Sequence, residues 1–169
     1  MTGTPRTGTP RSGCAINAAI EVLGDRWSVI VLRDLMFGEN RHFRTLQRAS
    51  MEGIASNILA ARLRDLVAAG LLTREDAGSG KRAAYSLTEA AIQLVPVLAE
   101  LGWWGLNHQP TSEPLRTRAQ ILYEGGRPLW EDFMNELREE HLGIPAPDTG
   151  RPTVREQLEA AYAEASVKA

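Results

Sequence analysis

The sequence predicts a mainly α-helical protein that carries one small β-hairpin. Apolar residues recur at three-and-four spacing in several segments, which is the period of an amphipathic helix. Short strand candidates occur only on the two sides of the glycine-rich stretch 77–82. Glycine and proline clusters separate the helical segments. With 169 residues and 43% hydrophobic content, the chain can bury one core and carry a smaller appendage.

The first thirteen residues repeat Thr-Gly-Thr-Pro-Arg and contain no apolar side chain except Met1. Burial cannot offset the entropy of ordering such a segment, so we expect 1–13 to be a flexible arm. The arm lacks the apolar stretch of a secretory signal, and the chain has no run of about 18 apolar residues. These features predict a cytoplasmic protein with no membrane segment.

Two helices are expected over 14–23 and 27–37. The second is almost wholly apolar along one side, so it is expected to lie in the core. Its apolar residues are Val29, Ile30, Leu32, Leu35 and Met36.

A short basic helix and a tight turn follow. In the helix over 41–48, Phe43 and Leu46 are expected to face inward. Its arginines, Arg41, Arg44 and Arg48, are expected to face outward. Gly53 closes a short turn before the next helix, so this region is a helix-turn-helix.

The second helix of this pair has a narrow apolar seam and a flat outer face. The seam has helical spacing and consists of Ile58, Leu59, Leu63, Leu66 and Val67. Small, polar and cationic residues occupy the helix start and the opposite side, namely Ser56, Asn57, Ala60, Ala61, Arg64 and Ala68. Such a face can lie in the major groove of DNA, where Ser56 and Asn57 bond bases or phosphates and Arg64 adds a cation. Taken alone, the pattern also fits an ordinary amphipathic surface helix.

A small hairpin is expected directly after this helix. Gly70 is placed to end the helix in a left-handed conformation. Strand candidates 73–76 and 83–87 flank a glycine-rich tip, where Lys81 and Arg82 can reach phosphate. A solvated hairpin with no ligand is the alternative. The order helix, turn, helix and hairpin predicts a winged helix-turn-helix.

The positive charge is concentrated in this region. Residues 41–85 hold eight Lys or Arg against four Asp or Glu, whereas residues 111–169 hold seven against eleven. The whole chain has a formal charge of −2 and a pI near 6.0. A basic face confined to one module suits site-specific DNA binding better than indiscriminate coating of nucleic acid.

Many ordered positions between residues 14 and 108 form one recurring set. They are Cys14, Asp25-Arg26-Trp27, Val31-Leu32-Arg33, Gly38, 41–46, Gly53-Ile54, Arg62-Leu63, Ala69-Gly70-Leu71, 85–88 and 94–98. Together these positions resemble the HxlR-type winged helix-turn-helix regulators of the MarR-like superfamily. The resemblance implies a bacterial transcription factor that binds operators as a homodimer. Two departures are Ala15, where the family usually has Pro, and Ala55, where Ser is common. The second departure leaves Ser56 as the expected N-cap.

Two groups of candidate residues follow. The expected DNA contacts are Arg41, Arg44, Ser56, Asn57, Ala60, Ala61, Arg64, Lys81 and Arg82. The expected dimer contacts lie on the first helix and on a long helix over 88–106, and are Ile16, Ile20, Leu98, Leu101, Trp103 and Trp104. Burial in the core fits the two tryptophans equally well. Two-fold symmetry would place the recognition helices about 34 Å apart, or a multiple of that, on a palindromic operator.

Cys14 is the single cysteine, so it cannot close a disulfide within the chain. Oxidation could link two protomers, add a small thiol or form sulfenic acid. The resemblance implies thiol sensing at this position. The alternative is a cysteine that is only packed, since no Lys, Arg or His adjoins it in sequence.

The long helix and the C-terminal extension complete the chain. Thr88 is expected to cap the helix over 88–106, with a bend at Pro96. We expect three domains: the arm 1–13, the winged helix-turn-helix 14–110 and a helical extension 111–169. The extension's helices are expected over 113–123, 128–142 and 153–167, with a capping box of Thr153 and Glu156. The extension either broadens the dimer interface or lines a pocket with Tyr123, Trp130 and Phe133.

Enzymatic function is not expected. His42, His108 and His141 lack metal-ligand spacing, and the sequence shows no phosphate loop or nucleophile elbow. We therefore expect no cofactor and no metal. The predicted partners are double-stranded DNA, a second copy of the chain and a small-molecule or oxidant effector. The favoured function is repression of transcription, and the alternative is a winged-helix module that binds proteins without binding DNA.

Overall fold

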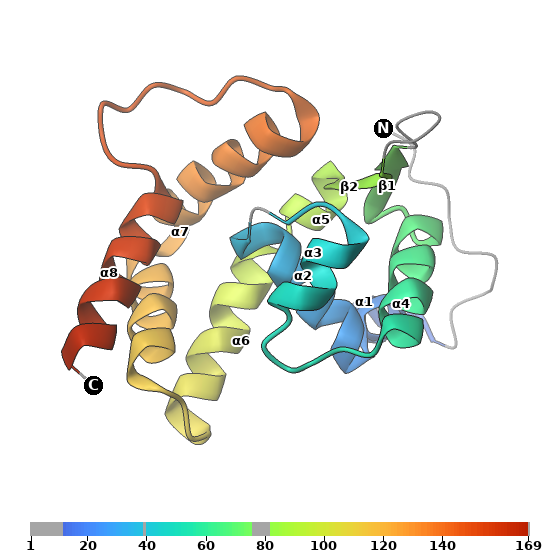
Figure 1. Cartoon of the computed structure of the whole chain (residues 1–169), viewed down its shortest axis with the longest axis horizontal. Helices are drawn as coiled ribbons and strands as arrows, with labels where there is room; N and C mark the ends of the chain where they lie inside the picture. Colours follow the sequence, from blue (N-terminus) through green and yellow to red (C-terminus); the bar gives the residue numbers. More distant parts are fainter. Residues whose placement is uncertain (1–11, 39, 76–81, 169) are drawn as a thin grey trace. The chain divides into compact units, whose positions relative to one another are not determined.

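The computed structural model describes residues 12–38, 40–75 and 82–168, and its internal contacts form two compact units, Met1–Ala91 and Ile92–Ala169. Figure 1 shows the order of the elements along the chain. They are α1 (Ala15–Leu23), α2 (Arg26–Phe37), α3 (Phe43–Ala49), α4 (Ser56–Ala68), β1 (Leu72–Glu75), β2 (Ala84–Leu87), α5 (Glu89–Ile92), α6 (Val95–His108), α7 (Glu113–Leu142) and α8 (Val154–Lys168). The mainly helical fold with one small two-stranded sheet is confirmed. The predicted arm lies outside the described residues apart from Ser12 and Gly13.

The first unit is built around α2. The Asp25 carboxylate accepts hydrogen bonds from the amides of Trp27 and Ser28, which caps the start of this helix. The core of the unit is apolar, with Val31, Leu32, Leu35 and Met36 from α2, Leu46 from α3, Leu59, Leu63 and Leu66 from α4, and Leu72 and Leu87 from the strands. Val29 and Ile30, which were expected in the core, are only half-buried, and Val31 beside them is fully buried.

The hairpin follows α4 as predicted. The amide of Gly70 bonds the Val67 carbonyl and that of Leu71 bonds the Leu66 carbonyl, each at 3.0 Å, while Gly70 has φ +73°. These two bonds form a Schellman motif, which ends α4 at a position that favours glycine. β1 and β2 then pair antiparallel, with Leu72 opposite Leu87. The hairpin tip, residues 76–81, lies outside the described part of the chain.

The long helix expected over 88–106 is two helices, so that prediction is wrong. α5 ends at Ile92 and α6 begins at Val95, which places Pro96 in the first turn of α6. Proline is favoured there because the first turn needs no amide donor from it. Thr88 caps only the short α5, since its Oγ1 accepts the Ala91 amide at 3.4 Å.

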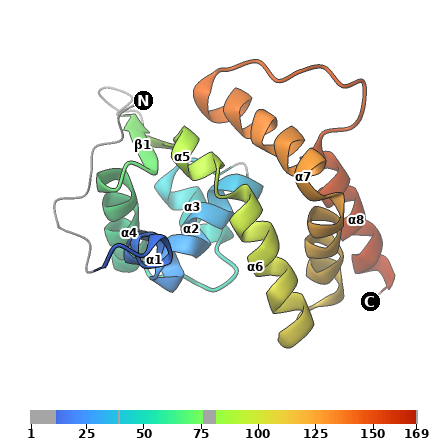
Figure 2. The same cartoon turned by 180° about the vertical axis from the view of Figure 1, so that it is seen from behind.

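The second unit consists of α6, α7 and α8, which Figure 2 shows from behind. α7 is interrupted at Gly126, where φ is 57° and ψ is −156°, close to the predicted break. Trp130 and Phe133 are buried, and the Trp130 Nε1 donates to the Leu122 carbonyl at 2.6 Å. These two side chains therefore belong to the core of the second unit, and the suggestion that they line a pocket with Tyr123 stays a prediction.

The start of α8 confirms the predicted capping box. The Thr153 amide donates to Glu156 Oε2 at 2.8 Å, and the Glu156 amide donates to Thr153 Oγ1 at 3.1 Å. The Trp103 and Tyr123 rings stack with their centroids 4.2 Å apart, which joins α6 to α7. α6 therefore packs with the extension. The boundary between the two compact units along the chain falls between residues 91 and 92, not after residue 110. As a functional division, the boundary after residue 110 stays a prediction.

Two glycines of the second unit should respond oppositely to alanine. Gly126 has backbone angles that are almost exclusive to glycine, so Gly126→Ala should lower the free energy of unfolding by about 1–3 kcal/mol. Gly105 lies inside α6, where, apart from its chain neighbours and the nearby backbone of the helix itself, an added methyl group would meet no described atom within 4 Å. Gly105→Ala should therefore raise the free energy of unfolding by about 0.5–1 kcal/mol. Urea unfolding followed by circular dichroism measures both. A Gly126→Ala variant at least as stable as the parent would contradict this account of Gly126.

Candidate nucleic-acid interface

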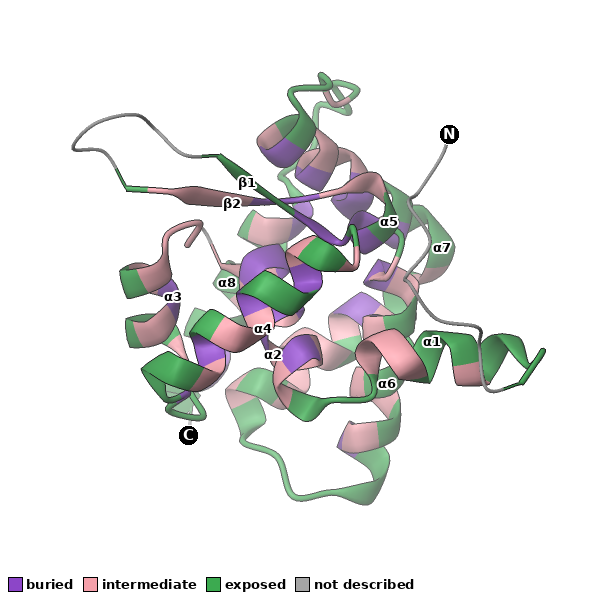
Figure 3. Cartoon of the chain, turned by 90° about the vertical axis from the view of Figure 1, so that its right-hand side faces the viewer, coloured by how far each residue is buried: buried purple, intermediate pink, exposed green. Residues whose placement is uncertain are grey.

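The outer face of α4 is largely exposed, and its predicted apolar seam is buried except for Ile58 and Val67, which are half-buried. Leu59, Leu63 and Leu66 are buried against the first unit. The opposite side carries Ser56, Asn57, Ala60 and Arg64 as exposed residues and Ala61 as a half-buried one. Figure 3 shows this exposed side of α4 turned toward the viewer. The face combines small side chains, an amide and a cation, which suits close approach to base edges.

Arg64 is the cationic residue of this face. Its side chain is 76% exposed, and its Nε lies 4.0 Å from the Asp65 carboxylate. The other arginine of α4, Arg62, contacts Asp65 at 3.0 Å and Asp25 at 3.6 Å. Arg62 therefore links α4 to the start of α2, and Arg64 is the arginine of α4 that points away from the core.

The expected N-cap of α4 is displaced by one residue. Ala55 occupies the N-cap position, and Ser56 is the first residue of the helix. Within the described chain, no side chain bonds the first amides of α4, so the prediction that Ser56 caps the helix is wrong. Uncapped amides at a helix start attract anions, which leaves Ser56 and the first turn of α4 suited to a phosphate oxygen.

Arg41 does not face outward as the sequence predicted. It is half-buried, and its guanidinium donates to the Tyr85 carbonyl at 3.2 Å and to the Ser86 hydroxyl. The Arg41 carbonyl also accepts the Tyr85 amide at 2.8 Å. The helical pattern misplaced this side chain because α3 begins at Phe43, two residues later than expected. Arg41 thus ties the segment before α3 to β2.

The remaining basic candidates flank α4. Arg44 and Arg48 are exposed on α3, and Arg82 is exposed just before β2. Lys81 lies outside the described residues. His42 Nδ1 lies 3.0 Å from the Ala83 carbonyl, next to Arg82, and His42 forms a β-bridge with Ala84. The base of the hairpin is therefore joined to the start of α3.

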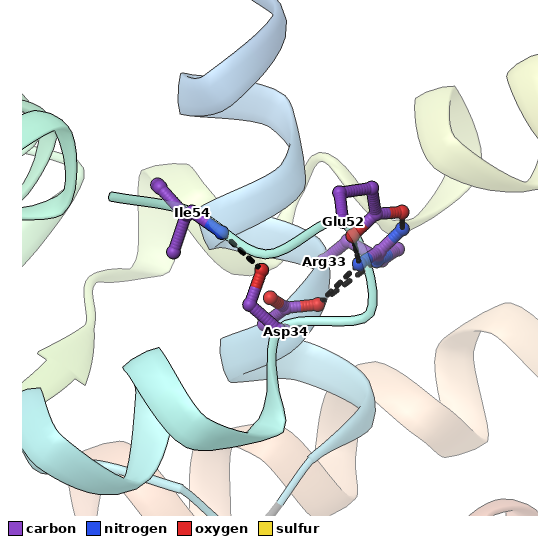
Figure 4. A network of polar contacts seen from close by, with 5 residues as sticks. Arg33, Asp34, Glu52 and Ile54 are labelled. Carbon is purple, nitrogen blue, oxygen red and sulfur yellow. Dashed lines mark hydrogen bonds and ion pairs between the residues drawn. The ribbon is translucent and has the colours of Figure 1, made fainter. Parts of the chain in front are cut away.

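The turn between α3 and α4 contains a contact that sequence analysis missed. Arg33 of α2 donates from Nη1 and Nη2 to the two carboxylate oxygens of Glu52, at 2.6 and 2.8 Å. It also donates from Nε to Asp34 Oδ1 at 2.9 Å (Figure 4). No local pattern could have revealed the pair, because Arg33 and Glu52 are 19 residues apart in sequence.

Cys14 is exposed at the N-cap of α1, so it does not pack into the core of its own chain. Its amide donates to the Ser12 hydroxyl at 3.4 Å. α1 itself buries none of its residues, and Ile16 and Ile20 are exposed on it. The alternative of a merely packed cysteine is therefore wrong within this chain.

The expected dimer residues on α6 divide into two groups. Leu101 and Trp104 are 52% and 57% exposed. Leu98 and Trp103 are half-buried, and Trp103 stacks on Tyr123 of the same chain. Of these four residues, Leu101 and Trp104 are therefore the more accessible to a second protomer.

An open groove of about 480 Å³ lies in the second unit, between the C-terminal half of α7 and the segment that leads into α8. The charged residues of its lining are the carboxylates Asp132, Glu136, Glu139 and Asp148 and a single arginine, Arg151. Burial raises the pKa of Glu136, whose carboxylate accepts the amides of Val154 and Arg155. Because these acidic groups repel phosphate, the groove is not a candidate nucleic-acid surface.

Two general features concern the described residues only. None of their helices is long and apolar enough to cross a membrane. Within the same ranges, no three His, Cys, Asp or Glu side chains converge as they would around a metal ion.

Comparison with known proteins gives a consistent result. The family model of the HxlR-like helix-turn-helix matches residues 22–113. Rv3095 of Mycobacterium tuberculosis, an HTH-type transcriptional regulator, is 34% identical over 119 residues, which cover 69% of this chain and 73% of Rv3095. Proteins that bear the same description occur in Mycobacterium bovis and Bacillus subtilis.

Solved structures with the same fold include two regulators. The structure of PA1607, a candidate transcription factor, is 35% identical with a TM-score of 0.54, and the match covers 60% of this chain and 69% of PA1607. The oxidized form of the redox regulator HypR is 27% identical with a TM-score of 0.51, and the match covers 58% of this chain and all of HypR.

Proposed function

This chain belongs to the HxlR-like helix-turn-helix family of transcriptional regulators, and on that premise we propose that it is a homodimeric repressor that binds a palindromic DNA operator. The observation that carries the proposal is the face of α4, where Asn57, Ala60 and Arg64 are exposed opposite a buried leucine seam. The family consists of regulators rather than enzymes. DNA as the target also implies a cytoplasmic location.

In the proposed complex, α4 lies in the major groove. The amide of Asn57 can bond an adenine edge and the guanidinium of Arg64 can bond a guanine edge, with Ala60 and Ala61 keeping the helix close to the bases. Arg44, Arg48 and Arg82 lie on flanking elements, where they can contact phosphates and fix the register. We also assign a phosphate contact to Lys81, from its place in the sequence.

The proposed dimer uses the exposed apolar residues of α1 and α6. Ile16 and Ile20 on α1, and Leu101 and Trp104 on α6, are large apolar side chains that a second copy of the chain can cover. An isologous dimer presents two copies of α4, which explains the expectation of a palindromic operator. Such a dimer represses by occupying a promoter, which requires no activating surface.

Thiol regulation is a second proposal, supported by the exposure of Cys14 and by the likeness to the redox regulator HypR. In the balanced reaction a peroxide oxidises the thiolate of Cys14 to sulfenic acid and releases water or an alcohol. The thiol of the second protomer then attacks this sulfur, and a disulfide and one water form. Two electrons pass from the two thiols to one peroxide.

One binding experiment tests both proposals. Fluorescence anisotropy with the DNA that flanks this protein's own gene should show specific binding by the reduced protein, with a higher affinity than for an unrelated duplex. Peroxide should weaken the binding of the parent protein and leave Cys14→Ser unchanged. Equal behaviour of the two proteins under peroxide would dismiss the thiol switch. Absence of specific binding would favour the alternative, a module that binds proteins instead of DNA.

A further inference from the structure

The turn that leads into α4 is held by an arginine from another helix. Ser50 stabilises the turn by two local hydrogen bonds. Its carbonyl accepts a hydrogen bond from the Gly53 amide, and its hydroxyl accepts one from the Ile54 amide, each at 3.2 Å. Ile54 is buried and anchors the end of the turn. Between these anchors, Glu52 is bound on both carboxylate oxygens by Arg33 of α2. Figure 4 shows Arg33, Asp34, Glu52 and Ile54 around this turn.

The contact between Arg33 and Glu52 is a bidentate guanidinium–carboxylate ion pair. A bidentate guanidinium–carboxylate pair fixes both distance and orientation, which a lysine at the same place could not do. Asp34, whose side chain is only 15% exposed, receives the Nε and Nη2 of Arg33 and so holds the guanidinium in place on α2. The hydrogen bonds from Arg33 lower the pKa of Glu52, and burial raises the pKa of Asp34. Asp34 therefore fixes the orientation of the Arg33 guanidinium, and the guanidinium binds the turn through Glu52.

We propose that Arg33 and Glu52 are positioning residues, which set the place of the first turn of α4 and thereby the specificity of the operator complex. This inference rests on the proposed DNA-binding function. Glu52 precedes Ser56 by four residues, so a movement of the turn displaces Ser56 and Asn57. The buried leucines of α4 begin only at Leu59, its fourth residue, so the exposed Ser56 and Asn57 precede the part of the helix that the core holds.

A simple charge effect and a positioning role of Glu52 predict opposite changes in the affinity for operator DNA when Glu52 is neutralised. Glu52 is a carboxylate in the turn beside the proposed DNA face, and Arg33 is already matched by two carboxylates. On charge alone, Glu52→Gln should strengthen binding to DNA, because it removes a negative charge and leaves Arg33 less compensated. A positioning role predicts weaker binding to the specific site, because the first turn of α4 is less well placed.

We expect Glu52→Gln to bind its operator about fivefold more weakly, with unchanged affinity for an unrelated duplex and an unchanged salt dependence. The matched control is Glu75→Gln, which removes the same charge from an exposed residue of β1 and should not weaken operator binding. Arg33→Lys keeps the charge but loses the bidentate fork, so it should behave as Glu52→Gln does. Thermal unfolding checks that each variant is folded at the temperature of the binding assay.

A second measurement on the DNA-free protein separates this inference from the proposed function. Amide hydrogen exchange at Gly53, Ile54 and Leu59, whose amides are hydrogen-bonded in the turn and at the start of α4, should be at least about threefold faster in Glu52→Gln than in the parent, with the rest of α4 unchanged. Failure of the parent to bind any duplex specifically would remove the proposed function and with it the specificity role. Unchanged exchange, or operator binding by Glu52→Gln as tight as that of the parent, would overturn the positioning role itself.

Discussion

Glutamate in place of Ala60 should weaken operator binding by at least about 100-fold and leave the fold intact. Ala60 lies in the middle of the exposed face of α4 and carries only a methyl group. In the proposed complex, glutamate there would place a carboxylate among base edges and phosphates and would hold the helix away from the groove floor. Alanine and glutamate both favour helix, so the melting temperature should hardly change. Anisotropy titration with the operator duplex measures the loss of affinity.

The matched control for this variant is Ala163→Glu. Ala163 is exposed on α8, so this substitution makes the same change in net charge in the second unit. It should lower the affinity for DNA by no more than a general charge effect, which added salt would remove. If Ala60→Glu and Ala163→Glu bind the operator equally well, the face of α4 does not contact DNA, and a winged helix that binds proteins becomes the better account.

Local patterns in the sequence predicted the elements that local physics determines. The leucines of α4 recur every three or four residues, and Leu59, Leu63 and Leu66 are buried as that spacing requires. The end of α4 was predictable because Gly70 readily adopts the positive φ of a Schellman motif. The capping box at the start of α8 was predictable because Thr153 and Glu156 lie three residues apart.

These failures involve contacts between distant parts of the chain, an error of one or two residues at a helix boundary, or the role of a single proline. Arg41 was placed on a helical face, but the helix begins at Phe43 and the arginine binds Tyr85, 44 residues away. The role of Arg41 depends on the position of β2 in the fold, which the local spacing of apolar residues does not reveal. The ion pair between Arg33 and Glu52 was missed for the same reason. Proline at position 96 was assigned to a bend, because a proline in the first turn of a new helix and one inside a bent helix look alike in sequence.

The second large expected effect is on the assembly of the proposed homodimer, through the apolar residues of α6. Leu101→Asp should raise the dissociation constant of the proposed homodimer by at least about 100-fold. Leu101 is half exposed in the single chain, so an aspartate there remains hydrated and the protomer should stay folded. In a dimer that covers this residue, the carboxylate loses water without gaining a partner, which costs several kcal/mol. Sedimentation equilibrium across a range of protein concentrations measures the change.

Val167→Asp provides the comparison for the assembly measurement, because Val167 is an apolar residue of α8 that is 89% exposed and lies outside the proposed interface. It should leave the dimer unchanged. Leu101→Asp should also make operator binding depend steeply on protein concentration, since a monomer engages only one half-site and the symmetric complex requires two. A parent protein that sediments as a monomer would refute the homodimer, whereas a Leu101→Asp protein that remains dimeric would move the interface away from this face of α6.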